Sequence, residues 1–409
     1  MVIIRLQGGL GNQLFQYALY RQLLAQGFSV KIDEVSGFVG DRQRRPGLKE
    51  AFGVSYEAAS SLEVDTLRDA FLDPFSRIRR KLTGRRSKEW EEPDGRFYPE
   101  VLAMEDAYLN GYFQSESYFP DPAVQADLAE MFAENIRRRL KNDMSFSDTD
   151  APIPGSAGPV ASHPEPPKGP GTVTKSVRES MTDTSDFAGW AARIAADGGR
   201  SVSLHIRRGD YLKPDTAETH GGICTERYYE KAVAQILAEV PNAVFYVFSD
   251  DPAYAAEWIS RHRTAGEGEF RLIAVKDPAQ PQTASPAEDH SRPSDNCTQQ
   301  QRNDVSSASA APGPNKGSLE RDVQSLLLMR CCRHHILANS SFSWWGAWEP
   351  GAVPSSSGNT LAGQDLPGSP EPSAPDPEPH PPLLLAPSRW FNNRAFDAIY
   401  TDRMRRIEG

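Results

Sequence analysis

Residues 201–210 read SVSLHIRRGD, a short apolar run that ends in a histidine, two arginines and an aspartate. The first six residues predict a buried strand, and the polar residues mark the point where that strand gives way to a loop. An arginine keeps its proton at working pH and offers a planar fork of donors that matches phosphate oxygens. Arg207 and Arg208 are therefore candidates for holding a diphosphate, although such a string by itself is more often a surface ion-pair cluster.

Strand and helix signals alternate on both sides of this stretch, in a pattern typical of an α/β fold. Strands are predicted at 2–6, 28–32, 201–206, 243–248, 270–275, 336–338 and 383–386, and helices at 12–26, 226–239, 252–263, 319–333 and 342–348. The stretch 48–139 is predicted to be mostly helical. Because strands separated by helices form parallel sheets with covered faces, we expect two α/β domains that meet near 187–200 with a cleft between them.

Three segments, 143–186, 277–317 and 350–382, differ in composition from the rest of the chain. They contain 23 of its 33 prolines and only one of its aromatic residues. Such segments cannot bury enough apolar surface to offset the entropy of ordering, so we expect them to be disordered insertions. The expected organisation is an N-terminal domain over 1–142 and a C-terminal domain over 187–409 that carries the second and third insertions.

The charge balance argues against a nucleic-acid partner. The chain carries 45 basic and 55 acidic residues, and its net charge of −10 also disfavours attachment to anionic lipid through a generally basic face. A local exception is the run 77–88, which holds seven basic residues. This run predicts either a solvated helix end or a patch that docks on a membrane or an anionic glycan.

Cysteine content and hydropathy predict a soluble protein of the cytoplasm. Four cysteines in 409 residues do not form a disulfide framework, which fits a reducing compartment. No stretch approaches the roughly 18 apolar residues of a membrane span, and Met1 leads directly into a predicted strand without a signal peptide. We therefore expect no transmembrane segment, and peripheral contact with the inner membrane is the alternative.

A second polar stretch, GGLGNQ at 8–13, follows the first predicted strand and opens a helix. Glycines let the backbone approach a ligand closely, and the start of a helix offers unpaired N–H groups to an anion. The candidate ligand-binding residues are Gly9, Gly11, Asn12 and Gln13, with one amide capping the helix and the other facing a sugar. The pattern is neither a dinucleotide fingerprint nor a P-loop, and a bare turn explains the glycines about as well.

Two further polar stretches close other predicted strands. In FSDD at 248–251, Ser249 or Asp250 is expected to cap the following helix, and a carboxylate at this strand end can hold a guanine or a ribose hydroxyl. In ANSSFSWWGAW at 338–348, hydroxyls at a strand-to-helix junction can donate to phosphate oxygens. The candidates in this second stretch are Asn339, Ser340, Ser341, Phe342 and Ser343, whereas the tryptophans are expected to pack in the core.

In order along the chain, GGLGNQLFQYA at 8–18, HIRRGD at 205–210, FSDD at 248–251 and NSSFSWWGAW at 339–348 resemble the bacterial α-1,2-fucosyltransferases of glycosyltransferase family 11. The resemblance implies two Rossmann-like domains in the arrangement called GT-B. The N-terminal half would shape the acceptor side, and the C-terminal half would bind GDP-β-L-fucose. It also implies inverting transfer of L-fucose to O2 of a galactose in a cell-surface glycan such as lipopolysaccharide.

The chemistry of such a transfer assigns roles within the central motif. The leaving group is a diphosphate, so catalysis calls for a fixed cation where negative charge develops. Arg207 is the predicted catalytic cation, with Arg208 assisting it or pairing with Asp210. His205 and Asp210 are the candidates for the general base, and both can instead serve to orient the arginines.

This interpretation needs no metal and no cofactor besides the GDP-fucose donor. Asp148 and Asp150 have the DxD spacing of metal-dependent transferases but fall in a predicted insertion, and the CCRHH run at 331–335 lacks a second ligand pair. Three other functions stay open: a fucosyltransferase of different linkage, a non-catalytic sugar-nucleotide-binding protein, and an interaction hub built on the insertions. The expected partners are GDP-fucose and a galactose-containing acceptor.

Overall fold

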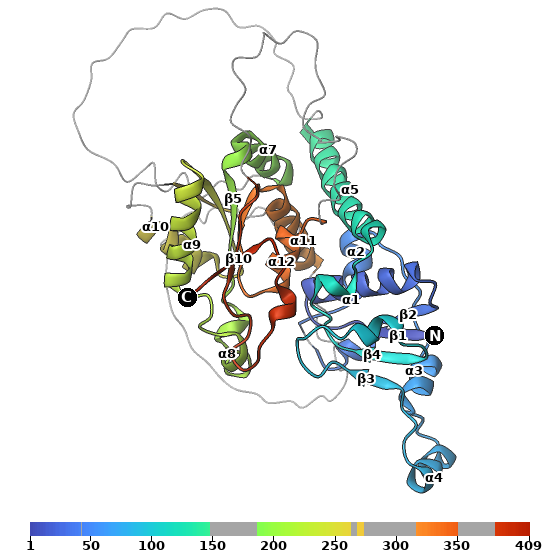
Figure 1. Cartoon of the computed structure of the whole chain (residues 1–409). Helices are drawn as coiled ribbons and strands as arrows, with labels where there is room; N and C mark the ends of the chain where they lie inside the picture. Colours follow the sequence, from blue (N-terminus) through green and yellow to red (C-terminus); the bar gives the residue numbers. More distant parts are fainter. Residues whose placement is uncertain (42, 148–185, 263–267, 274–315, 351–380) are drawn as a thin grey trace, which may run out of the picture.

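The computed structural model describes residues 1–41, 43–147, 186–262, 268–273, 316–350 and 381–409 (Figure 1). The three predicted insertions lie almost entirely outside these residues. The first was placed too early, because helix α5 (Pro122–Ser147) continues into it. Residues 143–147 contain no proline, so the helix has nothing to stop it there. The second predicted insertion, 277–317, ends two residues too late, since α11 (Lys316–Cys331) begins inside it.

The first half of the chain forms a four-stranded sheet in which all pairs are parallel, in the order β2-β1-β4-β3. Its strands are β1 (Val2–Arg5), β2 (Val30–Asp33), β3 (Glu89–Glu91) and β4 (Ala107–Asn110). Helix α1 (Leu10–Ala25) connects β1 to β2. The prediction that 48–139 is mostly helical missed β3 and β4, which are too short to show a period in the sequence.

Three short helices lie between β2 and β3 in the chain. They are α2 (Leu48–Phe52), α3 (Ser61–Arg68) and α4 (Pro74–Thr83), with single 3-10 turns at Ser36–Phe38, Pro99–Ala103 and Glu116–Tyr118. In Figure 1, α4 projects away from the body at the lower right, whereas α5 runs upward beside the second half.

The second half forms a six-stranded sheet, again with all pairs parallel, in the order β10-β9-β8-β5-β6-β7. The strands are β5 (Ser201–Ile206), β6 (Val244–Ser249), β7 (Glu269–Leu272), β8 (His334–Ile336), β9 (Leu384–Pro387) and β10 (Met404–Ile407). The helices are α7 (Phe187–Asp197), α8 (Pro214–His220), α9 (Glu226–Glu239), α10 (Pro252–His262), α11 and α12 (Ser341–Ala347). The predicted α/β class with parallel sheets is confirmed.

Alternate residues of the central strands face two separate helix layers. On β6, Phe245 and Val247 pack in a cluster with α9 and α10, whereas Tyr246 and Phe248 face the cluster that contains α11 and α12. This alternation is what a strand buried on both faces produces. Among the described residues, no helix has the length and apolar content needed to cross a bilayer.

The larger hydrophobic cluster continues from one sheet to the other through aromatic side chains. Phe15 on α1 lies 4.6 Å from the Trp344 ring and 4.9 Å from the Trp345 ring, both on α12. Phe119 stacks on Trp345 at 5.7 Å. The predicted core role of the tryptophans is confirmed, since Trp344, Trp345 and Trp348 are fully buried.

Candidate active site

A cavity of about 450 Å³ lies between the two halves, where the carboxyl ends of β5 and β6 face the start of α1. Ligands bind at this edge of open parallel sheets. Twelve of the residues predicted from the sequence line it: Gly9, Gly11, Asn12, His205, Arg207, Asp210, Ser249, Asp250, Asn339, Ser340, Ser341 and Phe342. Three predicted residues, Gln13, Arg208 and Ser343, do not.

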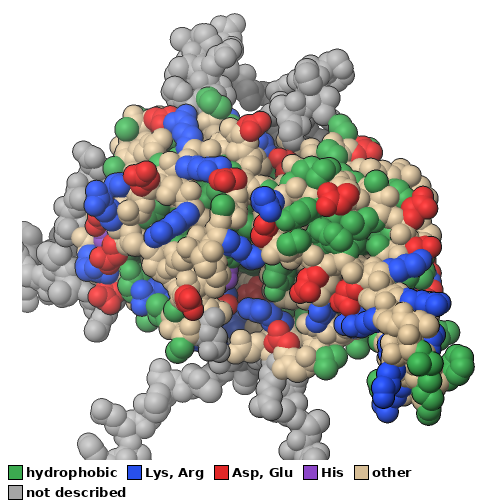
Figure 2. Space-filling view, turned by 60° about the horizontal axis from the view of Figure 1, so that its bottom comes forward, with side chains coloured by type: hydrophobic (Ala, Val, Ile, Leu, Met, Phe, Trp, Pro, Cys, Tyr) green, Lys and Arg blue, Asp and Glu red, His purple; other side chains and the backbone are tan. Residues whose placement is uncertain are grey.

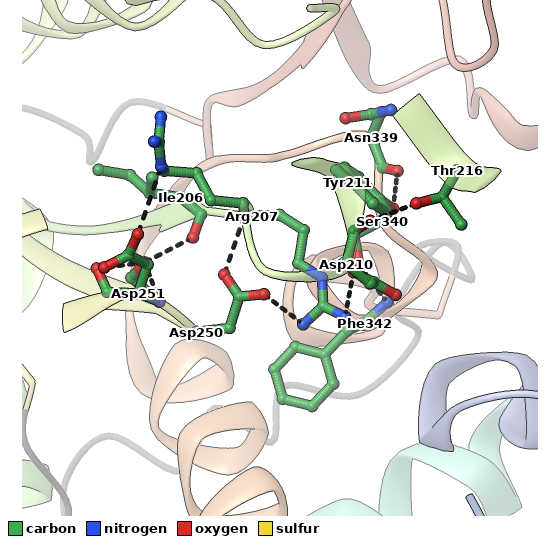
Figure 3. A network of polar contacts seen from close by, with 12 residues as sticks. Ile206, Arg207, Asp210, Tyr211, Thr216, Asp250, Asp251, Asn339, Ser340 and Phe342 are labelled. Atoms are coloured by element: carbon green, nitrogen blue, oxygen red, sulfur yellow. Dashed lines mark hydrogen bonds and ion pairs between the residues drawn. The ribbon is translucent and has the colours of Figure 1, made fainter. Parts of the chain in front are cut away.

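Arg207 is held between two carboxylates (Figure 3). Its Nη2 lies 2.8 Å from Asp210 Oδ1, and its Nη1 lies 3.0 Å from Asp250 Oδ2. Burial alone would lower the pKa of Arg207, but the charges of Asp250 and Asp210 outweigh burial and raise it. The guanidinium therefore enters the cavity as a fixed cation in one orientation.

The ion pairs around Arg207 reach both halves of the molecule. Arg44, from the first half, approaches Asp210 Oδ2 at 3.3 Å. On the other side, Asp250 Oδ1 accepts a hydrogen bond from the backbone N–H of Arg208 at 2.9 Å. Positive and negative charges thus alternate along one row, in the order Arg44, Asp210, Arg207 and Asp250. Asp210 forms an ion pair with an arginine on each side.

Asp250 is available to Arg207 because it does not cap the following helix. The expectation that Ser249 or Asp250 caps that helix is wrong, since Asp251 accepts the hydrogen bond from the N–H of Tyr254 at 3.1 Å. The hydroxyl of Ser249 donates to Ile206 O at 2.8 Å and so ties the end of β6 to the end of β5. Two adjacent aspartates offer equal capping chemistry, and only the tertiary contact with Arg207 separates their roles.

Arg208 points away from the main cavity. Its guanidinium lies 3.7 Å from the centre of the Tyr254 ring, and its Nε is 3.4 Å from Asp251. It therefore pairs with Asp251 and not with Asp210. Arg208 lines a smaller cavity of about 290 Å³ that adjoins Arg207, so a role in holding a ligand there stays a prediction.

The two amides at the start of α1 have different roles, and neither caps the helix. Gln13 is buried and bonds only to the backbone: it donates to Gly8 O and Arg45 O and accepts from the N–H of Gly47. It fixes a turn and does not face a sugar. Asn12 lines the cavity, where its Oδ1 accepts from Gln114 and Ser341, both at 2.6 Å.

The two glycines of this turn also differ. A Cβ on Gly9 would meet no atom within 4 Å, so the start of α1 is open toward the cavity. A Cβ on Gly11 would lie 2.6 Å from the backbone of Ser341 and Phe342. Gly11 therefore permits close contact between α1 and the second half, which is a packing requirement more than a ligand contact.

The polar side chains after β8 mostly stabilise the loop that carries them. Asn339 Nδ2 donates to His220 O and Trp390 O, each at 3.2 Å. Ser340 accepts from the N–H of Phe342, and Ser343 donates to Ala338 O and Ser340 O. Ser343 is buried behind the loop, and of the three hydroxyls predicted in this stretch only Ser340 and Ser341 reach the cavity.

His205 is buried, and burial together with the charge of Arg207 lowers its pKa to about 3. Its Nδ1 has no hydrogen-bond partner among the described residues. The ring is neutral at neutral pH, and a group of this pKa is a weak base there. Its backbone oxygen accepts from the hydroxyl of Tyr229, so the residue also anchors β5.

Several cavity residues were not predicted from the sequence. They include Arg44, Tyr211, His220, Asp322 and Arg394. Desolvation raises the pKa of the Asp322 carboxyl, on α11, to about 6. The sequence alone does not show that Asp322 belongs to the site. Asp322 lies near Arg207 only because α11 packs between the two halves. Within the described ranges, no cluster of His, Cys, Asp or Glu side chains is arranged to hold a metal ion, and Asp148 and Asp150 lie outside those ranges.

The sequence has relatives whose names describe sugar transfer. Residues 172–274, which include β5 to β7 and the ion-paired arginines, match the family described as Glycosyl transferase family 11. The chain is 32% identical over 148 residues to an alpha-1,2-colitosyltransferase of Escherichia coli, and this match covers 36% of each chain. It is 24% identical over 357 residues to the O-antigen biosynthesis glycosyltransferase WbnK of Escherichia coli, covering 84% of this chain and 88% of that one.

No solved structure matches this chain significantly. Open parallel α/β sheets bind ligands at the carboxyl ends of their strands. A cation at the end of the central strand β5 suits a negatively charged substrate there. The match to glycosyl transferase family 11 covers about a quarter of the chain, and the chain spans about a third of the colitosyltransferase relative that it matches.

Proposed function

We propose that the protein is an inverting glycosyltransferase that moves L-fucose from GDP-β-L-fucose to O2 of a galactose in a cell-surface glycan. The observation that carries this proposal is Arg207, held between Asp210 and Asp250 at the end of β5 and facing a cavity built from both halves. The two halves would then act as the two domains of a GT-B enzyme. The second half would hold the nucleotide and the first half the acceptor.

In this mechanism the bond between the fucose anomeric carbon and the diphosphate oxygen breaks with its electron pair on the diphosphate. Arg207 stabilises the negative charge that develops there, from a position set before the substrate arrives. The acceptor hydroxyl attacks the opposite face of the sugar, which turns the β-linked donor into an α-linked product. The hydroxyl proton must leave to a base.

Several titratable side chains line the cavity, and three of them are candidate acceptors of that proton. Asp210 is engaged by Arg207 and Arg44, and His205 is buried with a strongly lowered pKa. Asp322 is the third, and its pKa of about 6 suits proton transfer near neutral pH. Asp322 therefore joins the two predicted residues as a candidate base, and its pKa and its exposure favour it over the buried His205.

The proposal is tested by incubating the full chain with GDP-fucose and galactose-terminated oligosaccharides, with GDP release and product linkage read by NMR. We expect an α-1,2-linked fucoside. Tight GDP binding without GDP release in the presence of acceptors would support the non-catalytic sugar-nucleotide-binding protein instead. A β-linked product would contradict inversion, and another linkage would identify a fucosyltransferase of different specificity.

A second candidate function is transfer of colitose, because one relative is named an alpha-1,2-colitosyltransferase. Colitose is L-fucose without its 3-hydroxyl, so the same cavity would have to accept a less polar sugar. A site that hydrogen-bonds this hydroxyl rejects the deoxy sugar by about 10⁴–10⁵, whereas a site without such a contact discriminates only about 10–200-fold. The ratio of kcat/KM for the two GDP-sugars decides between the functions.

The acceptor is proposed to be a growing O-antigen glycan, since another relative is named an O-antigen biosynthesis glycosyltransferase. The acceptor panel should therefore include O-antigen fragments that end in galactose. Transfer to none of these fragments, with transfer to other galactosides, would place the enzyme in a different glycan.

A further inference from the structure

Residues 71–88, called here the basic arm, form an exposed projection from the first half (Figure 1). The arm is built around α4, none of whose residues is buried. It is nevertheless a defined element: Asp73 caps α4 by accepting from the N–H of Ser76, and Arg80 donates to Asp69 O and Phe71 O at its base. An amphipathic helix normally buries its apolar face, and α4 buries none against the rest of the chain that the structure describes.

One side of the arm is an apolar stripe. Leu72, Phe75, Ile78 and Leu82 are 76%, 78%, 59% and 79% exposed. The spacing of three and four residues places Phe75, Ile78 and Leu82 on one face of α4, and Leu72 directly precedes the residue that caps the helix. Among the described residues, ten large hydrophobic side chains are exposed, and four of them fall within these eleven positions. This clustering separates the stripe from the scattered apolar residues that are normal on a surface.

Basic side chains flank the stripe. Arg77 and Lys81 are exposed, and neither they nor Arg86 form an ion pair with the described residues. Asp73 is the single acidic residue of the arm, so the arm carries a net charge of +6 while the whole chain carries −10. Figure 2 shows green and blue side chains gathered together on this projection at the lower right.

We propose that the basic arm docks on the surface of an anionic phospholipid bilayer. A short helix with an apolar stripe and a basic flank lies in the interface, with the stripe among the acyl chains and the cations at the headgroup phosphates. The remainder of the chain is strongly negative and is repelled by such a surface, so the arm is the part that makes contact. An anionic glycan would match the charges but would leave the apolar stripe without a partner.

The test is co-sedimentation of the full chain with vesicles of phosphatidylcholine alone or with phosphatidylglycerol. We expect binding to the anionic vesicles only, weakened by added salt. Because each basic residue near such a surface contributes roughly fivefold in affinity, reversing two charges in Arg77→Glu/Lys81→Glu should weaken binding more than about 25-fold. Phe75→Ser/Ile78→Ser should weaken it at least tenfold, since both side chains leave the acyl region.

Matched controls lie elsewhere on the surface. Val39→Ser removes an apolar side chain that is 80% exposed, and Arg227→Glu reverses an exposed charge at the start of α9. Neither change should alter vesicle binding. All four variants should keep the thermal unfolding midpoint and the GDP release rate with a soluble acceptor. Vesicle binding itself is measured without substrate, so its failure would not contradict the proposed reaction.

Three outcomes would overturn the proposal. The first is equal binding to neutral and anionic vesicles, or to neither. The second is binding to a soluble anionic polysaccharide that Phe75→Ser/Ile78→Ser leaves unchanged, which would identify a glycan as the partner. The third is a dimer in gel filtration that the arm variants dissociate, which would identify a second copy of the chain as the partner.

Discussion

Replacing Arg207 by lysine keeps one positive charge at the end of β5 but removes the planar fork. In the structure, two nitrogens of the guanidinium contact two different carboxylates, Asp210 at 2.8 Å and Asp250 at 3.0 Å. A lysine ammonium is a single point on a flexible stem and cannot contact both carboxylates and also face a diphosphate in a fixed orientation. The fold should survive, because Asp210 keeps Arg44 and Asp250 keeps the N–H of Arg208.

The magnitude follows from these contacts. Loss of one preorganised donor to a developing oxyanion costs about 10²–10³ in kcat, or about 2.7–4 kcal/mol. Loss of one charge-assisted hydrogen bond costs the folded state about 1.5–3 kcal/mol, so the unfolding midpoint should fall by several degrees without abolishing folding. The KM for the donor should change less than kcat, because the interaction grows in the transition state.

The assay is steady-state GDP release with a saturating acceptor, together with thermal unfolding of each variant. Arg208→Lys is the matched control, because Arg208 stacks on Tyr254 outside the main cavity, and its kcat should fall less than tenfold. The reasoning is refuted if Arg207→Lys turns over within about tenfold of the wild type, or if Arg208→Lys is the more damaged variant.

Four further predictions address other parts of the structure. Gly11→Ala should lower the unfolding midpoint and activity together, because its Cβ would lie 2.6 Å from the backbone of the second half; an unchanged midpoint in differential scanning calorimetry would show that the contact yields. If Asp322 is the base, its carboxyl must be ionised, so kcat/KM should fall below pH about 6 in the wild type; a pH–rate profile of Asp322→Asn should lack this limb and show a lower rate throughout. EDTA should leave the GDP release rate unchanged, and loss of turnover restored by Mg²⁺ or Mn²⁺ would contradict the arginine-based mechanism. His205 and His335 both have a pKa lowered to about 3 by burial, so the unfolded state binds protons below pH 6.5 that the native state does not, and stability should fall as the pH drops from about 6 toward 3. Urea unfolding at several pH values should show a slope smaller by about 1.4 kcal/mol per pH unit in His335→Gln, and identical slopes would place the protonation elsewhere.

The sequence predicted the elements with the strongest patterns. Strand β5 and helix α9 have the predicted bounds, because apolar residues alternate along the buried strand and recur on one face of the capped amphipathic helix, so each shows a clear period. Strand β10, which has two exposed arginines in four residues, was not predicted. Its pairing with β9 comes from the sheet, and its own composition does not favour a strand.

The candidate site was predicted in its residue types but not in its contacts. The strand ends supplied Arg207, Asp210 and Asp250, since polar residues after buried strands are visible in the sequence. The sequence could not show that Asp251 caps α10, that Arg208 turns to Tyr254, or that Asp322 faces the cavity. These are choices between chemically similar residues, and the packing of distant segments makes them.

The aromatic contact between α1 and α12 has a consequence for how the molecule responds to heat and to ligands. Phe15 lies against Trp344 and Trp345, so neither half can expose its side of this contact without exposing the other. The whole body should therefore melt in one cooperative transition and not in two. A nucleotide bound at the second half would then protect amide protons in the β1–β2 region as well, although it touches neither strand.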